Sequence, residues 1–468
     1  MRRFDAAVIG GGVLGCFTAR NLCRYSISSV LIEAKEDVCT EISRANTAIV
    51  YAGYDNKPGS LKAEMSVRGN AAMDRLCEEL EVPFSRCGSL MVSFGAQADA
   101  VLQKKLRAGL AAGVPDLRLI CGEEAREREP MLARGATSAL YAPSTGTVNP
   151  WQLGIAAYEN AAANGCEMLL GSRVMQIKKS AYGYILETET ETLECRCVLN
   201  CAGLAADRVQ ELLFPPSVRL TLDGADFLIL DRDAGATKHI IFHESEEKGK
   251  GITAVPTTDG NLLLGPSRRP LHGKPFATMQ EGIAFLRETT AAVLPDVPLD
   301  RIIRSFASVR PNPQRVVLRD GEYVPDGSSI GSFCIERPAP GFTSLIGIKT
   351  PGLTCADQLG RMLAEETAAF LGAEKNDAFS PQRAAIRQVR GLSFEQRRLL
   401  AEENPAYADM ICRCEDISRG EILEAIARGA RTPDAVKRRV GTAMGHCQGS
   451  RCSRAICELL ERSGHGTR

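Results

Sequence analysis

Near its start the chain reads Ala6-Ala7-Val8-Ile9-Gly10-Gly11-Gly12-Val13-Leu14-Gly15, an apolar run that leads into a glycine-rich turn. In this pattern Gly10 permits a tight turn from a strand into a helix, and Gly12 lets the backbone approach a pyrophosphate. Gly15 lets the helix pack closely on the strand, while the N–H groups and dipole of the helix N-terminus favour bound phosphates. The stretch therefore predicts a dinucleotide-binding site at the beginning of the fold.

The residues after the turn complete the same unit. A helix is expected over residues 16–22 and a strand over 30–32, which ends in Glu33. A carboxylate there can accept a hydrogen bond from a ribose 2′-hydroxyl. An ordinary turn of an α/β domain is the alternative, because the chain has 43 glycines. The ordered succession of strand, turn, helix, strand and acid within about 30 residues favours the dinucleotide site.

Size and composition are those of a globular protein of two or three domains. Of its 468 residues, 44% are hydrophobic and 24% are charged. Lys and Arg balance Asp and Glu at 57 each, so we expect no nucleic acid or anionic membrane as a partner. No apolar stretch approaches the ~18 residues of a direct membrane span, and Asp5 interrupts any signal-peptide core. We expect a cytoplasmic protein, with any membrane attachment made through a partner.

The middle of the chain first alternates helices with strands and then becomes rich in strands. Residues 42–54 suit a loop that passes under a cofactor and continues into a buried strand. Between about 218 and 309, strand-like segments alternate with turns, and Asp259-Gly260 between two apolar runs predicts a hairpin. Residues 375–409 are charged and contain two prolines, which indicates a surface connection.

Four cysteines near the end of the chain form two close pairs. The 17 cysteines are an odd number in a chain that we expect in a reducing compartment, which favours thiols and metal ligands over disulfides. Cys412 and Cys414 are one pair, and Cys447 and Cys452 are the other, both on polar flanks. Four thiolates suit tetrahedral zinc or an iron–sulfur cluster. The C-x-C spacing favours the cluster, because zinc knuckles commonly have two residues between the cysteines of a pair.

Residues 410–468 also resemble the bacterioferritin-associated-ferredoxin type of domain. The likeness rests on Cys412-Arg413-Cys414-Glu415 and on Gly445-His446-Cys447-Gln448-Gly449-Ser450-Arg451-Cys452. It implies one [2Fe–2S] cluster, whose ligands would be Cys412, Cys414, Cys447 and Cys452.

The first 375 residues are similar to the FAD-dependent oxidoreductases of the D-amino-acid-oxidase and glycerol-3-phosphate-dehydrogenase group. The likeness lies in Gly10–Gly15 with Glu33, Ser43–Gly53, Asn200–Gly203 and Gly347–Thr354. It implies an α/β fold, in which a Rossmann-like FAD-binding domain carries a β-rich substrate domain and a small helical C-terminal [2Fe–2S] domain follows. The ranges that we expect are 1–375 for the oxidoreductase (FAD-binding parts about 1–80, 145–205 and 325–375; substrate domain about 81–144 and 206–324), 376–409 for a linker and 410–468 for the cluster domain.

The same resemblance implies the residues that contact FAD. They are Gly10, Gly12, Val13, Leu14, Gly15, Glu33, Ser43, Val174, Ala202, Gly203, Gly352, Leu353 and Thr354. The order of the domains resembles the large subunit of anaerobic glycerol-3-phosphate dehydrogenases. That order implies a small anionic substrate and a partner that is an electron-accepting flavoprotein or a membrane-anchor subunit. A flavin joined to a cluster indicates a dehydrogenase, because an oxidase that returns both electrons to oxygen would not need the cluster.

Three cations are candidates for contact with the substrate. Arg310 matches the family's arginine that clamps an anionic group, and a surface arginine is the alternative. Lys250 matches an active-site lysine of glycerol-phosphate oxidases, although a solvated turn fits its charged surroundings equally. Lys349 could lie beside the flavin and favour its anionic reduced form, and a surface lysine at a helix end is the alternative.

Tyr51 departs from the family pattern. Members that oxidise glycerol phosphate or 2-hydroxyglutarate commonly have histidine there, and this chain has no histidine before His239. Tyrosine, with an ordinary pKa of ~10, is a poor base at neutral pH. An alcohol must lose a proton as the hydride leaves, whereas a neutral amine need not. The resemblance makes glycerol 3-phosphate the first candidate substrate, followed by a 2-hydroxy acid or a secondary amino acid. The alternative from another functional class is an electron-transfer subunit.

Overall fold

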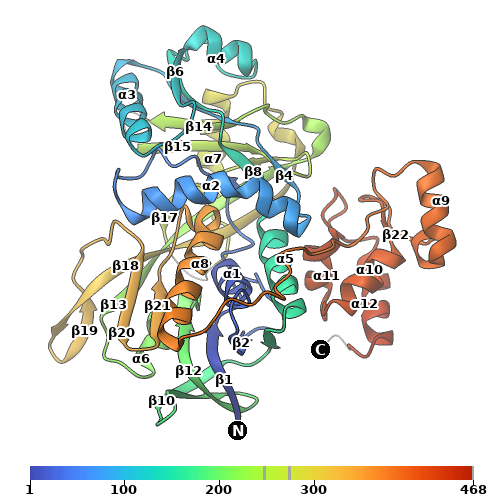
Figure 1. Ribbon diagram of the computed structural model, residues 1–468. Helices are drawn as coiled ribbons and strands as arrows, with labels where there is room; N and C mark the ends of the chain where they lie inside the picture. The colour runs from blue at the N-terminus through green and yellow to red at the C-terminus, as the bar shows by residue number, and fades with distance from the viewer. Residues whose placement is uncertain (246–248, 272–275, 466–468) are drawn as a thin grey trace.

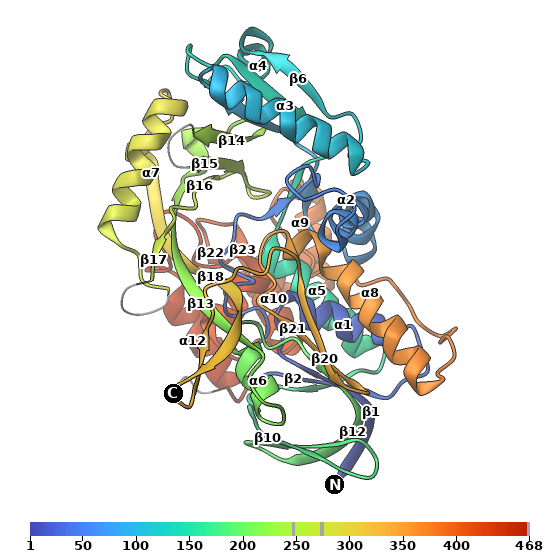
Figure 2. The same cartoon turned by 90° about the vertical axis from the view of Figure 1, so that its left-hand side faces the viewer.

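The computed structural model describes residues 1–245, 249–271 and 276–465. Figure 1 shows the first sheet and the N-terminus at the bottom, a β-rich part with α3 (Ala96–Ala111) and α4 (Gly122–Arg128) above, and the C-terminal segment beside α5 (Pro150–Ala163). Figure 2 shows the same vertical order from the side, with the pair β13 (Val218–Leu230) and β18 (Ile302–Arg319) extending from the β-rich part down towards the first sheet. The expected α/β class is confirmed.

The first sheet is built around the N-terminal strand. β1 (Arg2–Ile9) pairs in parallel with β12 (Thr192–Asn200) on one side and with β2 (Ser29–Ile32) on the other. Because both faces are covered, residues 6–9 of β1 are almost fully buried and the strand has a continuous apolar run. The remaining strands of this sheet are β9 (Glu167–Leu169), β10 (Val174–Lys179), β11 (Tyr184–Thr188), β20 (Cys334–Ala339) and β21 (Phe342–Ile346).

Helices cover the first sheet and place the glycine turn. α1 (Val13–Leu22) packs against α5 and against α8 (Gly352–Leu371), and α8 in turn packs against α2 (Leu61–Leu80). Phe17 and Leu359, from α1 and α8, are completely buried in this layer. The N-terminus of α1 is thereby held at the carboxyl end of β1, where ligands of open α/β sheets bind. A short helix, α6 (Ala206–Glu211), follows β12.

The second sheet forms the β-rich part and has β13 and β18 as a long antiparallel pair. The stacked rings of Phe227 and Phe306, opposite one another with centroids 4.7 Å apart, stabilise this pair. α7 (Gln280–Val293), which the sequence did not predict, packs against the sheet. The other strands are β5 (Ser89–Ser93), β6 (Arg118–Cys121), β7 (Ser138–Ala142), β14 (Ile240–Ser245), β15 (Gly249–Pro256), β16 (Leu262–Leu264), β17 (Arg269–Pro270) and β19 (Glu322–Pro325). β15 and β16 form the hairpin expected at Asp259-Gly260, and β3 (Ile49–Val50), β4 (Phe84–Ser85) and β8 (Gly146–Val148) form a small separate sheet.

The C-terminal domain is small and mainly helical, as expected. Its helices α10 (Arg419–Ala427), α11 (Pro433–Val440) and α12 (Ser453–Arg462) surround a core of small and aliphatic side chains and accompany the hairpin of β22 (Met410–Cys412) and β23 (Ile417–Ser418). The segment before it contains a helix that the sequence did not predict, α9 (Phe394–Glu403), which begins at a capping box of Ser393 and Gln396. None of the described helices has the length and apolar character that crossing a membrane requires.

Candidate active site and cysteine centre

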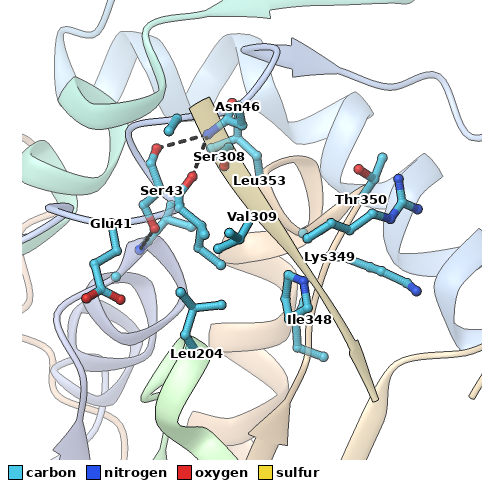
Figure 3. A pocket seen from close by; sticks show the side chains of 18 of the residues that line it. Glu41, Ser43, Asn46, Leu204, Ser308, Val309, Ile348, Lys349, Thr350 and Leu353 are labelled. Atoms are coloured by element: carbon cyan, nitrogen blue, oxygen red, sulfur yellow. Dashed lines mark hydrogen bonds between the residues drawn. The ribbon is translucent and has the colours of Figure 1, made fainter. Parts of the chain in front are cut away.

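A cavity of about 1100 Å³ opens at the N-terminus of α1 and continues to β18. This volume slightly exceeds the roughly 300–1,000 Å³ of ordinary small-molecule pockets, which suits a dinucleotide with a small substrate beside it. Figure 3 shows side chains that line it from four separate segments. They are Glu41, Ser43 and Asn46 from the loop after β2, Leu204 after β12, Ser308 and Val309 from β18, and Ile348, Lys349, Thr350 and Leu353 from the turn before α8 and the first residues of that helix.

The glycine turn is too tight for side chains at its two ends. Gly10 has φ +106°, and a Cβ on it would lie 2.5 Å from the carbonyl oxygen of Cys201. A Cβ on Gly15 would lie 1.8 Å from the carbonyl oxygen of Gly10. Gly15 therefore serves the contact between helix and strand and does not line the cavity, whereas Gly10 and Gly12 do line it.

Glu33 and Ser43 hold the backbone around this turn. Glu33 accepts hydrogen bonds from the N–H of Gly11 at 2.6 Å and of Lys35 at 2.8 Å. Burial raises the pKa of Glu33, and these two N–H donors oppose the effect. The hydroxyl of Ser43 accepts from the N–H of Val13 at 3.0 Å. The first turn of α1 and the loop of Ser43 are thus joined at the cavity wall.

The structure brings most of the predicted cofactor residues to this one cavity. Thr354 is the exception besides Gly15: it is buried, and its hydroxyl accepts from the N–H of Tyr51 at 3.0 Å. The predicted residues that line the cavity are Gly10, Gly12, Val13, Leu14, Glu33, Ser43, Val174, Ala202, Gly203, Gly352 and Leu353. The side-chain-free turn, the open helix N-terminus and the buried acid fit the phosphates and ribose of FAD.

One wall of the cavity carries positive side chains. Arg310 on β18, Lys349 before α8, Lys62 on α2 and Arg268 before β17 all line it. The Nε of Arg310 is buried and has no hydrogen-bond partner within the described part of the chain. Burial lowers the pKa of Arg310, and Arg268 adds to the effect. A half-buried guanidinium with a buried donor that has no partner favours an anionic ligand.

The pairing of β13 with β18 positions the groups next to Lys349. Asp223 stands opposite Arg310, and Arg310 and Asn312 share one face of β18 because side chains alternate along a strand. Asn312 Nδ2 donates to Asp223 Oδ2 at 3.0 Å, and Lys349 Nζ donates to Asn312 Oδ1 at 2.6 Å. Burial lowers the pKa of Lys349 to about 8, with Arg310 and Lys62 as further causes. Its surroundings therefore favour the neutral amine of Lys349 more than water does.

Tyr51 lies at the same wall, with its ring stacked on Phe242 at a centroid distance of 6.0 Å. The hydroxyl of Tyr51 lies 3.5 Å from the hydroxyl of Thr47. Tyr51 is also close enough to Arg310 to influence the pKa of the guanidinium. Lys250 belongs to β15, but its side chain lies outside the described residues.

Sequence reasoning missed several polar residues of this wall. Lys62, Asp223 and Arg268 line the cavity, and Asn312 links Asp223 to Lys349. The pair Arg310 and Asn312, two residues apart in a strand-like segment, was a usable signal because such residues face the same side. No sequence pattern marked Lys62 or Arg268 as cavity residues, because only the folded structure brings them close to β18.

The four C-terminal cysteines approach one another as two pairs. The Sγ atoms of Cys414 and Cys447 lie 3.5 Å apart, and Cys452 interacts with Cys412. Cys412 and Cys452 are buried, whereas Cys414 and Cys447 are half-buried. The N–H of Gly449 lowers the pKa of Cys447, which favours the thiolate that binds metal.

This donor set fits a [2Fe–2S] cluster better than a zinc ion. Residues 1–245, 249–271 and 276–465 contain no group of three or more His, Cys, Asp or Glu side chains arranged around one metal ion. Two thiolates on one tetrahedral metal, with bonds of about 2.3 Å, lie roughly 3.8 Å apart, close to the spacing of the Cys414–Cys447 pair. Two pairs, each at one metal, match the two irons of a [2Fe–2S] cluster.

A buried ion cluster joins the cysteine domain to the loop that lines the cavity. Arg439 donates to both oxygens of Asp37, at 2.8 and 3.0 Å, and Arg438 donates to the same carboxylate. All three side chains are at most 4% exposed. Burial acts to raise the pKa of Asp37, but the two arginines hold it below its ordinary value. Since removing one partner of such a pair costs about 3–5 kcal/mol, α11 is firmly tied to this loop.

Two known protein families match the two parts of the chain. The family described as FAD dependent oxidoreductase matches residues 5–366, and that described as BFD-like [2Fe-2S] binding domain matches residues 410–462. These matches show FAD and a [2Fe–2S] cluster as the cofactors.

Relatives of similar length carry both oxidoreductase names that the sequence suggested. A glycerol 3-phosphate dehydrogenase of Caloramator mitchellensis is 37% identical over 466 residues, 98% of this chain and 94% of the relative. The mitochondrial L-2-hydroxyglutarate dehydrogenase of Homo sapiens is 30% identical over 282 residues, 56% of this chain and 60% of that protein. The reduced, FAD-bound structure of an L-α-glycerophosphate oxidase from Mycoplasma pneumoniae has a TM-score of 0.72 at 22% identity, covering 82% of this chain and 99% of the oxidase, and shows the shared fold.

Proposed function

The chain belongs to the FAD-dependent oxidoreductase family, and on that premise we propose that it is a dehydrogenase of glycerol 3-phosphate whose electrons leave through its [2Fe–2S] domain. The observation that carries the choice of an anionic substrate is the positive wall around Arg310. A phosphate group offers the oxygen acceptors that a guanidinium binds bidentately. The relative that is similar over 98% of this chain bears the name of this activity.

When bound, FAD supplies the two-electron acceptor for a hydride, and a [2Fe–2S] cluster supplies a one-electron carrier. The chain's own residues would bind and orient the substrate. Arg310, with Arg268 and Lys62 on the same wall, would hold the phosphate, so that the carbinol end faces the turn before α8. The cost of leaving the buried Nε of Arg310 without a partner would then be removed.

Lys349 is the group that we propose as proton acceptor for the substrate hydroxyl. Its pKa of about 8 leaves a useful fraction of neutral amine near neutral pH. The proton would pass from the substrate O–H to the Nζ of Lys349, which Asn312 Oδ1 holds by a hydrogen bond. Tyr51, which lies at the same wall, would contact the substrate beside Arg310, and Lys250 stays a predicted second contact.

Anaerobic reduction of the bound flavin tests the substrate directly. Glycerol 3-phosphate, 2-hydroxyglutarate and secondary amino acids would be added separately to the oxidised protein, without an acceptor, and flavin bleaching followed by absorbance. We expect rapid bleaching with glycerol 3-phosphate. Bleaching by an amino acid alone would refute the proposal, and bleaching by no candidate would favour an electron-transfer subunit.

A 2-hydroxy acid is the second candidate. The similarity to an L-2-hydroxyglutarate dehydrogenase favours it, because a carboxylate would fit the same positive wall. An amine or amino acid also stays among the substrates to be tested, because a neutral amine can lose a hydride without a base that accepts an O–H proton. Equal bleaching rates with glycerol and with glycerol 3-phosphate would show that the wall does not select an anion.

The partner and the location follow from the same function. We propose an electron-accepting flavoprotein or a membrane-anchor subunit as the partner, and a cytoplasmic location. None of the 17 cysteines, which all lie within the described residues, forms a disulfide, in keeping with a reducing compartment. Co-purification of the untagged partner with a tagged chain from its native host, followed by reduction of that partner, would test the assignment.

A further inference from the structure

The two cysteine pairs differ in their access to solvent. Cys412 and Cys452 are 2% and 0% exposed, whereas Cys414 and Cys447 are only half-buried. The half-buried pair therefore marks the side of the centre that another molecule can approach.

Positive side chains surround this half-buried pair. Arg413 and Arg451 are both exposed and lie next to the ligand cysteines Cys414 and Cys452 in the sequence. Within the described ranges, neither arginine has a carboxylate in ion-pair distance. Arg304, exposed on β18, donates to Oε1 of Gln448 at 3.0 Å, which extends the positive surface onto the β-rich part.

Lys437 on α11 is half-buried and lies within electrostatic reach of Arg304. Burial lowers its pKa to about 8, and the charge of Arg304 is the next cause. The carboxylates nearby are already occupied, because Asp434 pairs with Arg44 and Arg438, and Glu415 pairs with Arg232 and Arg390. Asp416 remains as an exposed acid at 3.9 Å from Arg397. We call Arg304, Arg413, Lys437 and Arg451 the cationic face.

We propose that the cationic face is the docking surface for an acidic electron-accepting protein. The proposal rests on the function above and specifies the partner's surface. Complementary charge steers such a partner to the half-buried thiol pair and raises the association rate. A protein fits better than a lipid surface. Among the described residues, the exposed large apolar side chains all lie outside the stretch 410–465, so this domain offers no apolar side chain that would insert into a membrane.

Binding to two haem proteins of opposite surface charge tests the proposal without measuring turnover. The immobilised holoprotein would be titrated with acidic cytochrome b5 and with basic cytochrome c at low and high salt. We expect cytochrome b5 alone to bind, with affinity falling at least about tenfold between 20 and 300 mM salt because screening grows. The double change Arg413→Glu and Arg451→Glu should lower that affinity by about the same factor.

Controls separate the surface from the cofactor and from the enzyme function. Arg319→Glu, an exposed arginine at the other end of β18, should leave binding unchanged. The double variant could lose its cluster, which absorbance would reveal. In that case the binding test would be repeated with Arg304→Glu, because Arg304 lies on β18 and not in the cysteine loops. Substrate-driven flavin bleaching of the same samples reports on the dehydrogenase proposal alone. Unchanged cytochrome b5 binding in the charge-reversed variants, or binding only to anionic lipid vesicles, would overturn the docking proposal.

Discussion

The flavin cavity takes its walls from segments between Ile9 and Leu353, whereas the cysteine centre lies wholly between Cys412 and Cys452. The cavity offers backbone turns and a positive wall that several strands and helices assemble together. The cysteine centre offers four like side chains on two neighbouring loops. A single substitution should therefore abolish the cysteine centre, whereas it should remove one function of the cavity and leave the others.

The largest effect is expected from Cys447→Ser. A thiolate ligand is lost, so the iron and acid-labile sulfide content should fall to background, while FAD content and substrate-driven bleaching remain. Metal analysis and absorbance would measure both. Cys457→Ser, a half-buried cysteine on the adjacent helix α12, is the matched control and should keep its iron. A Cys447→Ser protein that still holds the cluster, or that cannot reduce its flavin, would break the contrast between the two regions.

A smaller but still large effect is expected from Arg310→Met. Losing a half-buried charge that binds the substrate anion should cost about 2–5 kcal/mol, roughly 30- to 5,000-fold in kcat/KM. FAD content should be unchanged, because Arg310 lies at the substrate wall, remote in sequence from the glycine turn. Arg304→Met on the same strand is the control, and steady-state kinetics with a small dye acceptor should not distinguish it from the unaltered protein. Equal loss of flavin and of substrate affinity in Arg310→Met would remove its assigned role.

The smallest effect is a change in pH dependence at Lys349. Its lowered pKa of about 8 means that kcat/KM should rise as the pH approaches 8 and then level off, because only the neutral amine accepts a proton. Asn312→Ala should move this rise in kcat/KM to lower pH, because the Asn312 oxygen stabilises the charged amine of Lys349 and its loss lowers the pKa further. Lys349→Met should abolish the pH-dependent rise in kcat/KM. A kcat/KM that falls above pH 8 would show that Lys349 serves as a charged anchor for the anion instead.

The contrast also explains what could be predicted from sequence. The cysteine ligands and the glycine turn are local patterns, so their residue spacing carries the information. Lys62 and Arg268 reach the cavity only through the packing of α2 and the pairing of β17 with β13, which spacing does not encode. Helix α9 was missed because its charged sequence and flanking prolines suggest a connection, although its capping box from Ser393 to Gln396 was visible.

The buried cluster of Asp37 with Arg438 and Arg439 has a consequence for biosynthesis. Domains generally fold from the N-terminus during translation, so the loop of Asp37 leaves the ribosome about 400 residues before its countercharges do. Until α11 has been made, a carboxylate destined for a dry interior has no partner and favours a solvated loop. The loop of Asp37 is among the first parts of the chain to emerge. It therefore reaches its final buried structure only at the end, when α11 of the C-terminal domain supplies Arg438 and Arg439.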